Sequence, residues 1–272
     1  MGLRVLCANV NNSNPLTHAI LNDDKSPAST LDNTDVIVIT EPWIRTIRPA
    51  TNEKGTVNHP NWKCHLPSAP IGEARVVVYI RKRSNLMSHI TRGRGDLIPI
   101  KITLPNNAHL SLLAVYNPPS TAAATEFISS TDLPPEPTLL VGDFNLHSPG
   151  WDDAVTVEND RAHRFCEWMA NNNIKVNNDS DKPTYHGHRF QHASVIDLAL
   201  TNSLLSFAFD ISHVKVHTDD HYGGDHYPIS IGIHPVQNQG QKNDLDSPDR
   251  LPTLRDEKKK TGSRLLHLNC LP

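Results

Sequence analysis

An apolar run at residues 139–142 leads directly into a carboxylate, an amide and an imidazole. These are Asp143, Asn145 and His147, each two residues from the next. In an extended strand alternate side chains point to the same side, so all three could face one spot beyond the strand end. A carboxylate beside an amide donor suits a site that binds a hard cation together with an anionic oxygen. Ordinary turn chemistry is the alternative, because Asp and Asn are common where strands end.

Polar residues follow or flank apolar strands at several other places in the chain. A binding site at the edge of a sheet collects its side chains from such positions. In isolation, Glu41 could be a solvated charge at a strand end, and Asn9 could be an amide that caps a loop. The other members of this set are Tyr116, Asn117, Ser194, Asp197, Asp225 and His226.

The elements that must position these residues are predicted from the hydrophobic pattern. Residues 36–39 and 76–78 are continuous and β-branched, which favours strands buried on both faces. The clearest helix is 159–173, where apolar residues recur at helical spacing and Asn159 could cap the first turn. Many strands with few helices predict an α/β sandwich of two sheets. Strands are expected at 3–7, 35–40, 62–66, 74–81, 97–104, 109–116, 138–142, 195–201, 213–217 and 229–233.

The composition of the chain changes near Pro235. Residues 237–264 contain almost no apolar side chains, so they cannot bury enough surface to offset the entropy lost on ordering. We therefore expect one folded domain at 1–235 and a disordered or linker-like tail at 236–272. The tail carries a run of three lysines at 258–260.

Charge, hydropathy and cysteine usage exclude several classes of protein. With 26 basic and 29 acidic residues the net charge is −3, which is not the basic signature of many nucleic-acid binders but still allows a local basic face. No apolar run is long enough for a membrane span, and the N-terminus lacks the pattern of a secretory signal. The four cysteines lie far apart without a CxxC pair, which argues for free thiols in an intracellular protein.

Taken in order, the strand-end residues resemble the endonuclease/exonuclease/phosphatase family, which includes DNase I and the apurinic endonucleases. The matching features are Asn9, Glu41, the Gly-Asp-Phe-Asn segment at 142–145, the Ser-Val-Ile-Asp segment at 194–197, and the Asp-His pair at 225–226. More narrowly, residues 142–151 resemble the GDFNxHxxxW segment in endonuclease domains of non-LTR retrotransposons. In those elements the domain precedes a reverse transcriptase, so the chain looks like a lone or truncated domain of this kind.

The resemblance implies a fold, a cofactor and an activity. The fold is a four-layer sandwich of two β-sheets flanked by helices, as in DNase I. The activity is Mg²⁺-dependent nicking of DNA, with Mn²⁺ able to substitute, and it implies a nuclear location. The partners implied are DNA and, in a full-length relative, a reverse transcriptase. No membrane partner is expected, and the resemblance does not give the oligomeric state or the target sequence.

The resemblance also implies a role for each matching residue. Glu41, Asn9 and Asp197 would lie at the metal. Asp143 would activate the attacking water, Asn145 would bind a phosphate oxygen, and His226 would donate to the developing charge. Asp225 would hold the ring of His226, and Tyr116 would assist catalysis. Substrate contacts are expected from Ser194, His147 and Arg189.

Other interpretations remain open at this point. A family member could instead be an abasic-site endonuclease or a lipid or inositol phosphatase, and a non-catalytic nucleic-acid-binding remnant belongs to a different class. The basic runs at 81–83 and 92–94 are candidate phosphate contacts, although such runs are usually solvated. The polar segment 46–60 matches no pattern and leaves one wall of the groove undefined.

Overall fold

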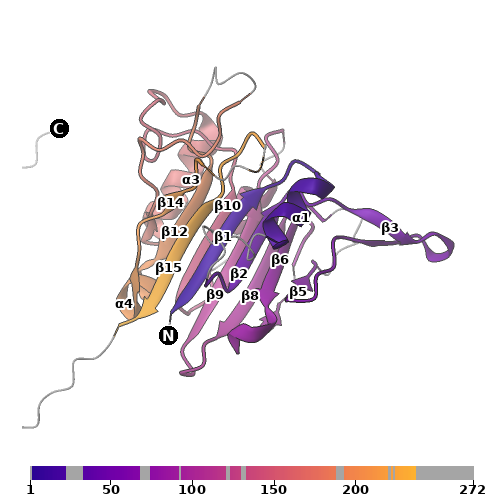
Figure 1. Cartoon of the computed structure of the whole chain (residues 1–272). Helices are drawn as coiled ribbons and strands as arrows, with labels where there is room; N and C mark the ends of the chain where they lie inside the picture. The colour runs from indigo at the N-terminus through magenta and orange to yellow at the C-terminus, as the bar shows by residue number, and fades with distance from the viewer. Residues whose placement is uncertain are drawn as a thin grey trace, which may run out of the picture. The chain divides into compact units, whose positions relative to one another are not determined.

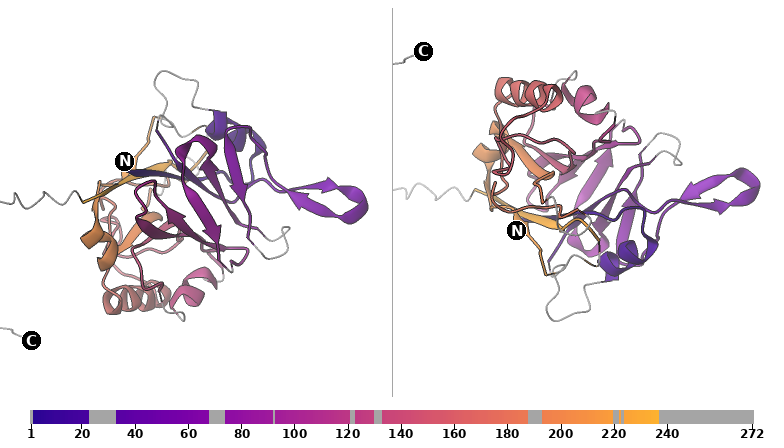
Figure 2. Two further views of the ribbon diagram at one scale, coloured as in Figure 1. Left: turned by 90° about the horizontal axis from the view of Figure 1, so that it is seen from below. Right: turned by 90° about the horizontal axis from the view of Figure 1, so that it is seen from above.

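Two large sheets pack face to face in the computed structural model, with helices on their outer sides (Figures 1 and 2). The structure describes residues 2–22, 33–67, 74–91, 93–120, 123–129, 133–187, 193–219, 222 and 224–236. The predicted tail beyond residue 236 lies outside these residues, and so does Arg189.

The first sheet has seven strands in the order β13-β15-β1-β2-β6-β5, with β14 also paired to β15. Its central strands β1 and β2 run parallel, and β15 runs antiparallel to β1. The strands are β1 (Leu3–Asn9), β2 (Val36–Thr40), β5 (Trp62–His65), β6 (Val76–Arg81), β13 (Phe209–Ile211), β14 (Lys215–Val216) and β15 (Ile229–Pro235).

The second sheet has six strands in the order β11-β12-β10-β9-β8-β7. Strands β9 and β10 run parallel, and β12 runs antiparallel to β10. The strands are β7 (Met87–Ile90), β8 (Leu97–Thr103), β9 (His109–Tyr116), β10 (Thr138–Asp143), β11 (Ile174–Val176) and β12 (Asp197–Asn202).

Helices cover the outer faces and complete four layers, as predicted. Ile20 and Leu21 of α1 (Asn14–Asn22) pack on the first sheet. Phe165 and Met169 of α3 (Asp160–Asn171) pack on the second. Asn159 caps α3 as expected, because its side chain accepts hydrogen bonds from two amides of the first turn. The remaining helices are α2 (Ala123–Ser129) and α4 (Ser203–Ala208).

The strand directions bring the chemical residues to one end of the sandwich. The carboxyl ends of β1, β2, β9 and β10 carry Asn9, Glu41, Tyr116 and Asp143. The antiparallel neighbours β12 and β15 begin at the same end, because Asp143 pairs with Asp197 and Cys7 pairs with Ile229. The apolar core between the sheets fixes this arrangement.

Several short strands were not predicted from the sequence. The largest omission is the hairpin of β3 (Arg45–Arg48) and β4 (Glu53–Gly55), which extends away from the two sheets (Figure 2). Every residue of β3 is exposed, so this pair has no hydrophobic alternation to recognise. The short strands β7, β11 and β13 were also missed.

None of the helices in the described part of the chain has the length and apolar character needed to cross a bilayer. Cys7, Cys64 and Cys166 are free thiols, as expected. Cys270 lies outside the described residues.

Candidate active site

An open pocket of about 290 Å³ lies where the strand ends converge. It brings together most of the side chains that the sequence singled out, although they come from both sheets. The predicted residues that line it are Asn9, Glu41, Tyr116, Asp143, Asn145, His147, Ser194, Asp225 and His226. Asp197 lies beneath this lining and is bonded to His226.

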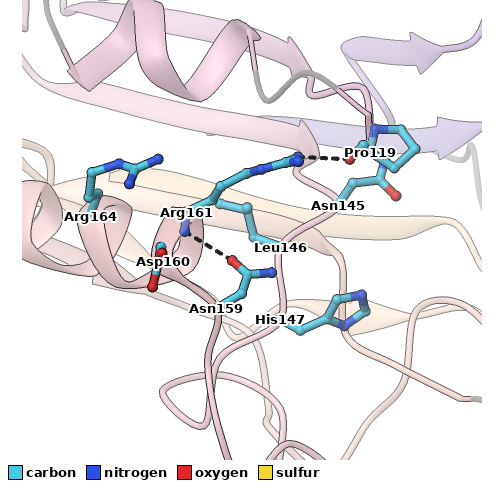
Figure 3. A pocket seen from close by; sticks show the side chains of 8 residues that line it. All are labelled: Pro119, Asn145, Leu146, His147, Asn159, Asp160, Arg161 and Arg164. Atoms are coloured by element: carbon cyan, nitrogen blue, oxygen red, sulfur yellow. Dashed lines mark hydrogen bonds between the residues drawn. The ribbon is translucent and has the colours of Figure 1, made fainter.

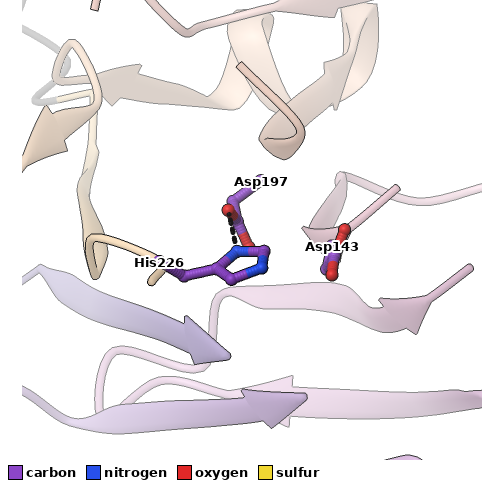
Figure 4. Close-up of side chains that lie close together, drawn as sticks. All are labelled: Asp143, Asp197 and His226. Atoms are coloured by element: carbon purple, nitrogen blue, oxygen red, sulfur yellow. Dashed lines mark hydrogen bonds and ion pairs between the residues drawn. The ribbon is translucent and has the colours of Figure 1, made fainter. Parts of the chain in front are cut away.

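The buried part of the site is formed by Asp143, Asp197 and His226 (Figure 4). One ligand atom from each lies within 4.8 Å of the others, and all three residues are buried. Nδ1 of His226 lies 2.8 Å from Oδ2 of Asp197, which forms an ion pair when the ring is protonated. The other Asp197 oxygen, Oδ1, is buried without a hydrogen-bond partner among the described residues.

Asp143 is held on both carboxylate oxygens. Nδ2 of Asn9 donates to Oδ2 at 2.9 Å, and the backbone N–H of Asn145 donates to Oδ1 at 3.1 Å. Burial, and then the neighbouring Asp197, raise the pKa of Asp143 to about 8, against the opposing effects of His226 and these hydrogen bonds. Asn9, which was expected at the metal, holds the Asp143 carboxylate through this side-chain amide.

His226 is poised to carry a positive charge. Burial disfavours the charged ring, but the carboxylates of Asp197, Asp143 and Asp225 outweigh it and raise the pKa of His226 to about 9. The partner of the ring is Asp197, which corrects the prediction that Asp225 holds it. Asp225 directly precedes His226 and lines the same pocket. Asp225 contributes its charge rather than this hydrogen bond.

Glu41 lies at the rim of the pocket and accepts a hydrogen bond from the hydroxyl of Tyr116. Burial and the adjacent Glu41 carboxylate raise the pKa of Tyr116, so its phenol stays protonated and keeps donating. Glu41 has a φ of 46°, a left-handed conformation that is uncommon for a residue with a side chain. Such strain tends to occur at functional sites.

The turn after β10 depends on two unusual backbone conformations. Gly142 has a φ of +155°, and a Cβ there would lie 1.8 Å from the carbonyl oxygen of Val115 in β9. Asn145 has a φ of 46°, and Nδ2 of its side chain donates to the backbone carbonyl of Asn117 at 3.0 Å. Only glycine fits the first position, which explains why Gly142 precedes Asp143.

Comparisons with known proteins agree with this geometry. The Endonuclease-reverse transcriptase family model matches residues 110–230. The endonuclease domain of TRAS1, a telomere-specific non-LTR retrotransposon, superposes with a TM-score of 0.68 at 15% identity, covering 86% of this chain and 99% of that domain. The protein has the DNase I-like fold. This confirms the predicted resemblance to the endonuclease/exonuclease/phosphatase proteins.

Two further solved structures share this DNase I-like fold. The Xenopus laevis APE2 catalytic domain superposes with a TM-score of 0.56 at 11% identity, covering 88% of this chain and 94% of that one. An AP endonuclease from Archaeoglobus fulgidus gives 0.54 at 14% identity, covering 84% and 98%. No curated protein sequence gives a significant match.

Three residues in or next to this site were not predicted from the sequence. Tyr185 lines the pocket, and its ring packs 4.8 Å from that of His226. Thr184 accepts hydrogen bonds from the amides of Ile196 and Asp197, at 3.1 and 2.9 Å. Buried Asp152 accepts one from the amide of Val195 at 3.0 Å. These three belong to loops without periodicity, so only the folded chain reveals them.

The donor chemistry of the site fits a hard divalent cation. Three carboxylates, Glu41, Asp143 and Asp197, lie in or directly beneath one pocket, and one buried Asp197 oxygen lacks a partner among the described residues. Oxygen ligands of this kind suit Mg²⁺ or Mn²⁺. With its pKa raised to about 9, the His226 ring is protonated near neutral pH, so both of its nitrogens are donors and neither has a lone pair for a metal.

The basic run at 81–83 does not serve the site. Arg81 is buried, donates to the carbonyl of Thr34 at 2.6 Å and stacks on Trp62 at 4.4 Å. It lies at the end of β6 remote from Glu41, because Thr40 pairs with Val76 at the other end of the strand. Arg92, of the second basic run, lies outside the described residues.

Proposed function

We propose that the protein is a divalent-metal-dependent endonuclease that nicks DNA. The observation that carries this proposal is the single pocket in which Glu41, Asp143 and His226 converge from both sheets. A phosphodiester needs a base for the attacking water and donors for the charge that develops on its oxygens. This pocket supplies both kinds of group within one buried cluster.

Asp143 acts as the general base in this proposal. Its carboxylate takes a proton from a water whose oxygen then bonds to phosphorus. The bond from phosphorus to the 3′ oxygen breaks, which leaves a 3′-hydroxyl and a 5′-phosphate. The hydrogen bonds from Asn9 and from the Asn145 amide fix the orientation of the carboxylate, so little reorganisation is needed during the reaction.

His226 and Asn145 stabilise the charge on the phosphoryl oxygens. The Asp197 carboxylate fixes Nδ1 of His226 and leaves Nε2 as the donor that faces the phosphate. A ring whose pKa is raised to about 9 is protonated near neutral pH, and a charged donor forms a stronger hydrogen bond. The side-chain NH2 of Asn145 has two N–H donors. Asn117 accepts one of them, and the other can donate to a phosphoryl oxygen.

Glu41 is the residue that we propose as the main metal ligand, with Asp197 and the Asn9 carbonyl nearby. The Tyr116 hydroxyl bonds to one Glu41 oxygen and positions the side chain at the rim of the pocket. When bound, Mg²⁺ would neutralise negative charge on the phosphate and the leaving oxygen. Ser194 and His147 line the same pocket as candidate substrate contacts, and Arg189 remains a prediction from the resemblance.

Nicking of supercoiled plasmid tests the proposed function. We expect relaxed circles with Mg²⁺ or Mn²⁺ and none with chelator, because the metal supplies essential charge. Glu41→Ala should abolish nicking, whereas Glu167→Ala removes an exposed carboxylate from α3 and should retain it. Undiminished nicking in chelator, or by Glu41→Ala, would refute the metal role.

The same assay separates the alternatives to this proposal. An abasic-site endonuclease would cut only plasmid or oligonucleotide that contains abasic sites. A lipid or inositol phosphatase would release inorganic phosphate from those substrates and leave plasmid intact. A binding remnant would retain DNA without cutting any substrate in either metal.

A further inference from the structure

A second pocket, of about 500 Å³, adjoins the active site (Figure 3). Pro119, Asn145 and His147 line both pockets, so the two cavities share a wall. The far side of the second pocket is the first two turns of α3, which contribute Arg161 and Arg164. A ligand that fills the active site can therefore continue directly into this second cavity.

The two arginines give the second pocket its anion-binding chemistry. They lie three residues apart on α3, so their side chains leave the same face of the helix. Arg161 donates one N–H to the carbonyl of Pro119 at 2.8 Å, which holds the side chain across the cavity and leaves its four other donors without a partner among the described residues. Arg164 makes no hydrogen bond or ion pair within the part of the chain that the structure describes. Both side chains are exposed and available to a ligand.

The helix end does not supply the binding groups. The Asn159 side chain accepts hydrogen bonds from the amides of Arg161 and Ala162, both at 3.0 Å, so these donors are already occupied. Asp160 also lines the pocket and offsets one of the two positive charges. Recognition of an anion here depends on the guanidinium groups, which bind phosphate through paired donors.

We propose that this second pocket binds the nucleotide next to the cleaved bond, and that Arg161 and Arg164 contact its phosphate. The inference rests on the proposed function, because it assumes a polynucleotide in the active site. A nucleic-acid strand carries a phosphate at every step, so the shared wall places a neighbouring phosphate beside the arginines. The pocket then favours polynucleotides over small phosphate esters, which cannot span both cavities.

A double variant, Arg161→Gln/Arg164→Gln, tests the pocket on a duplex with a mapped nick. We expect kcat/KM to fall at least about 10-fold, mainly through KM, and the salt dependence of binding to weaken by about two phosphate contacts. The matched control is Lys82→Gln/Arg83→Gln, which removes the same charge from two exposed residues at the remote end of β6. Arg164→Gln alone is the cleaner variant, because among the described residues Arg164 makes no hydrogen bond or ion pair that the substitution would remove.

A neutral methylphosphonate at the phosphate on either side of the nick makes the test specific. At one of the two positions the methylphosphonate should weaken DNA binding by the wild-type protein and by the control to the same extent. At that position it should have no effect on DNA binding by the double variant. Equal losses in all three proteins at both positions would overturn the proposal. So would a double variant that matches the wild type in KM and in salt dependence.

Equilibrium DNA binding in chelator distinguishes failure of this inference from failure of the proposed function. Binding that depends on the two arginines, without cleavage in any metal, would refute the nuclease and retain the pocket. Cleavage whose rate and KM are unchanged in the double variant would support the proposed nuclease activity and refute the proposed role of the second pocket. No binding and no cleavage would refute both.

Discussion

Two buried histidines of this protein have opposite electrostatic environments. His226 is 8% exposed and His65 is 6% exposed, so both lose most of their hydration. Burial and the neighbouring Lys63 lower the pKa of His65 to about 4, whereas the carboxylates around His226 overcome burial and raise its pKa to about 9. Near neutral pH one ring is neutral and the other is charged.

The difference shows what the strand ends add to the fold. His65 is on the edge strand β5, and Nε2 of its ring lies 3.3 Å from Ser88 Oγ, a neutral hydroxyl. His226 has Asp197 at 2.8 Å and Asp143 close by. Burying several carboxylates beside a histidine costs folding free energy, because charges removed from water are costly unless they are paired. A cluster of this kind therefore indicates a functional role rather than a stabilising one.

The largest expected effect comes from removing the base of this cluster. Asp143→Asn keeps the size of the side chain but cannot accept a proton, so we expect nicking to fall about 10³-fold. The control is Asp153→Asn, an exposed carboxylate near the same loop, which should keep its activity. The initial rate of plasmid relaxation measures both. An active Asp143→Asn protein with unchanged circular dichroism would refute the assigned role.

Removing the ion pair should make His226 resemble His65. In Asp197→Asn the ring keeps its burial and loses its main partner, so its pKa should fall from about 9 to below about 7. Nicking should fall about 10²-fold, because the ring loses both charge and orientation. The NMR titration of the His226 ring in chelator gives the pKa directly, and Asp210→Asn is the exposed control. A midpoint that stays near 9 would show that Asp197 does not set the charge.

The sequence predicted the positions of the active-site carboxylates well. Glu41 and Asp143 come at the ends of apolar strands, and the run before Glu41 is also β-branched. Parallel pairing of β1 with β2 and of β9 with β10 then brings them to one end. The helix at 159–173 and its Asn159 cap were also predicted, because capping and periodicity are local properties.

The partners within the site could not be predicted in the same way. His226 bonds to Asp197, which is 29 residues away in the chain, rather than to its neighbour Asp225. Arg81 belongs to a charged run, yet it is buried. Its side chain packs on Trp62, and its guanidinium donates to the carbonyl of Thr34. Such pairings are set by how the two sheets meet, and no local pattern encodes that geometry.

The smallest predicted effect concerns His65 and the stability of the fold at mildly acidic pH. The ordinary histidine pKa is about 6.5, whereas the folded value is about 4, so below pH 6.5 the unfolded chain binds a proton that the folded chain refuses. The contribution of neutral His65 to the unfolding free energy is fully present above pH 6.5 and is lost as the pH falls towards 4. By pH 5 this linkage amounts to about 1–2 kcal/mol, allowing for solvent screening at an edge strand.

His65→Asn removes the proton-binding group, so its unfolding free energy should depend less on pH between 7 and 5 than that of the wild type. Urea unfolding at the two pH values measures the difference. His89→Asn removes an exposed histidine of β7 and should keep the wild-type pH dependence. If His65→Asn and the wild type lose the same stability on acidification, His65 is not kept neutral by burial. The contrast with His226 would then rest on the active-site carboxylates alone.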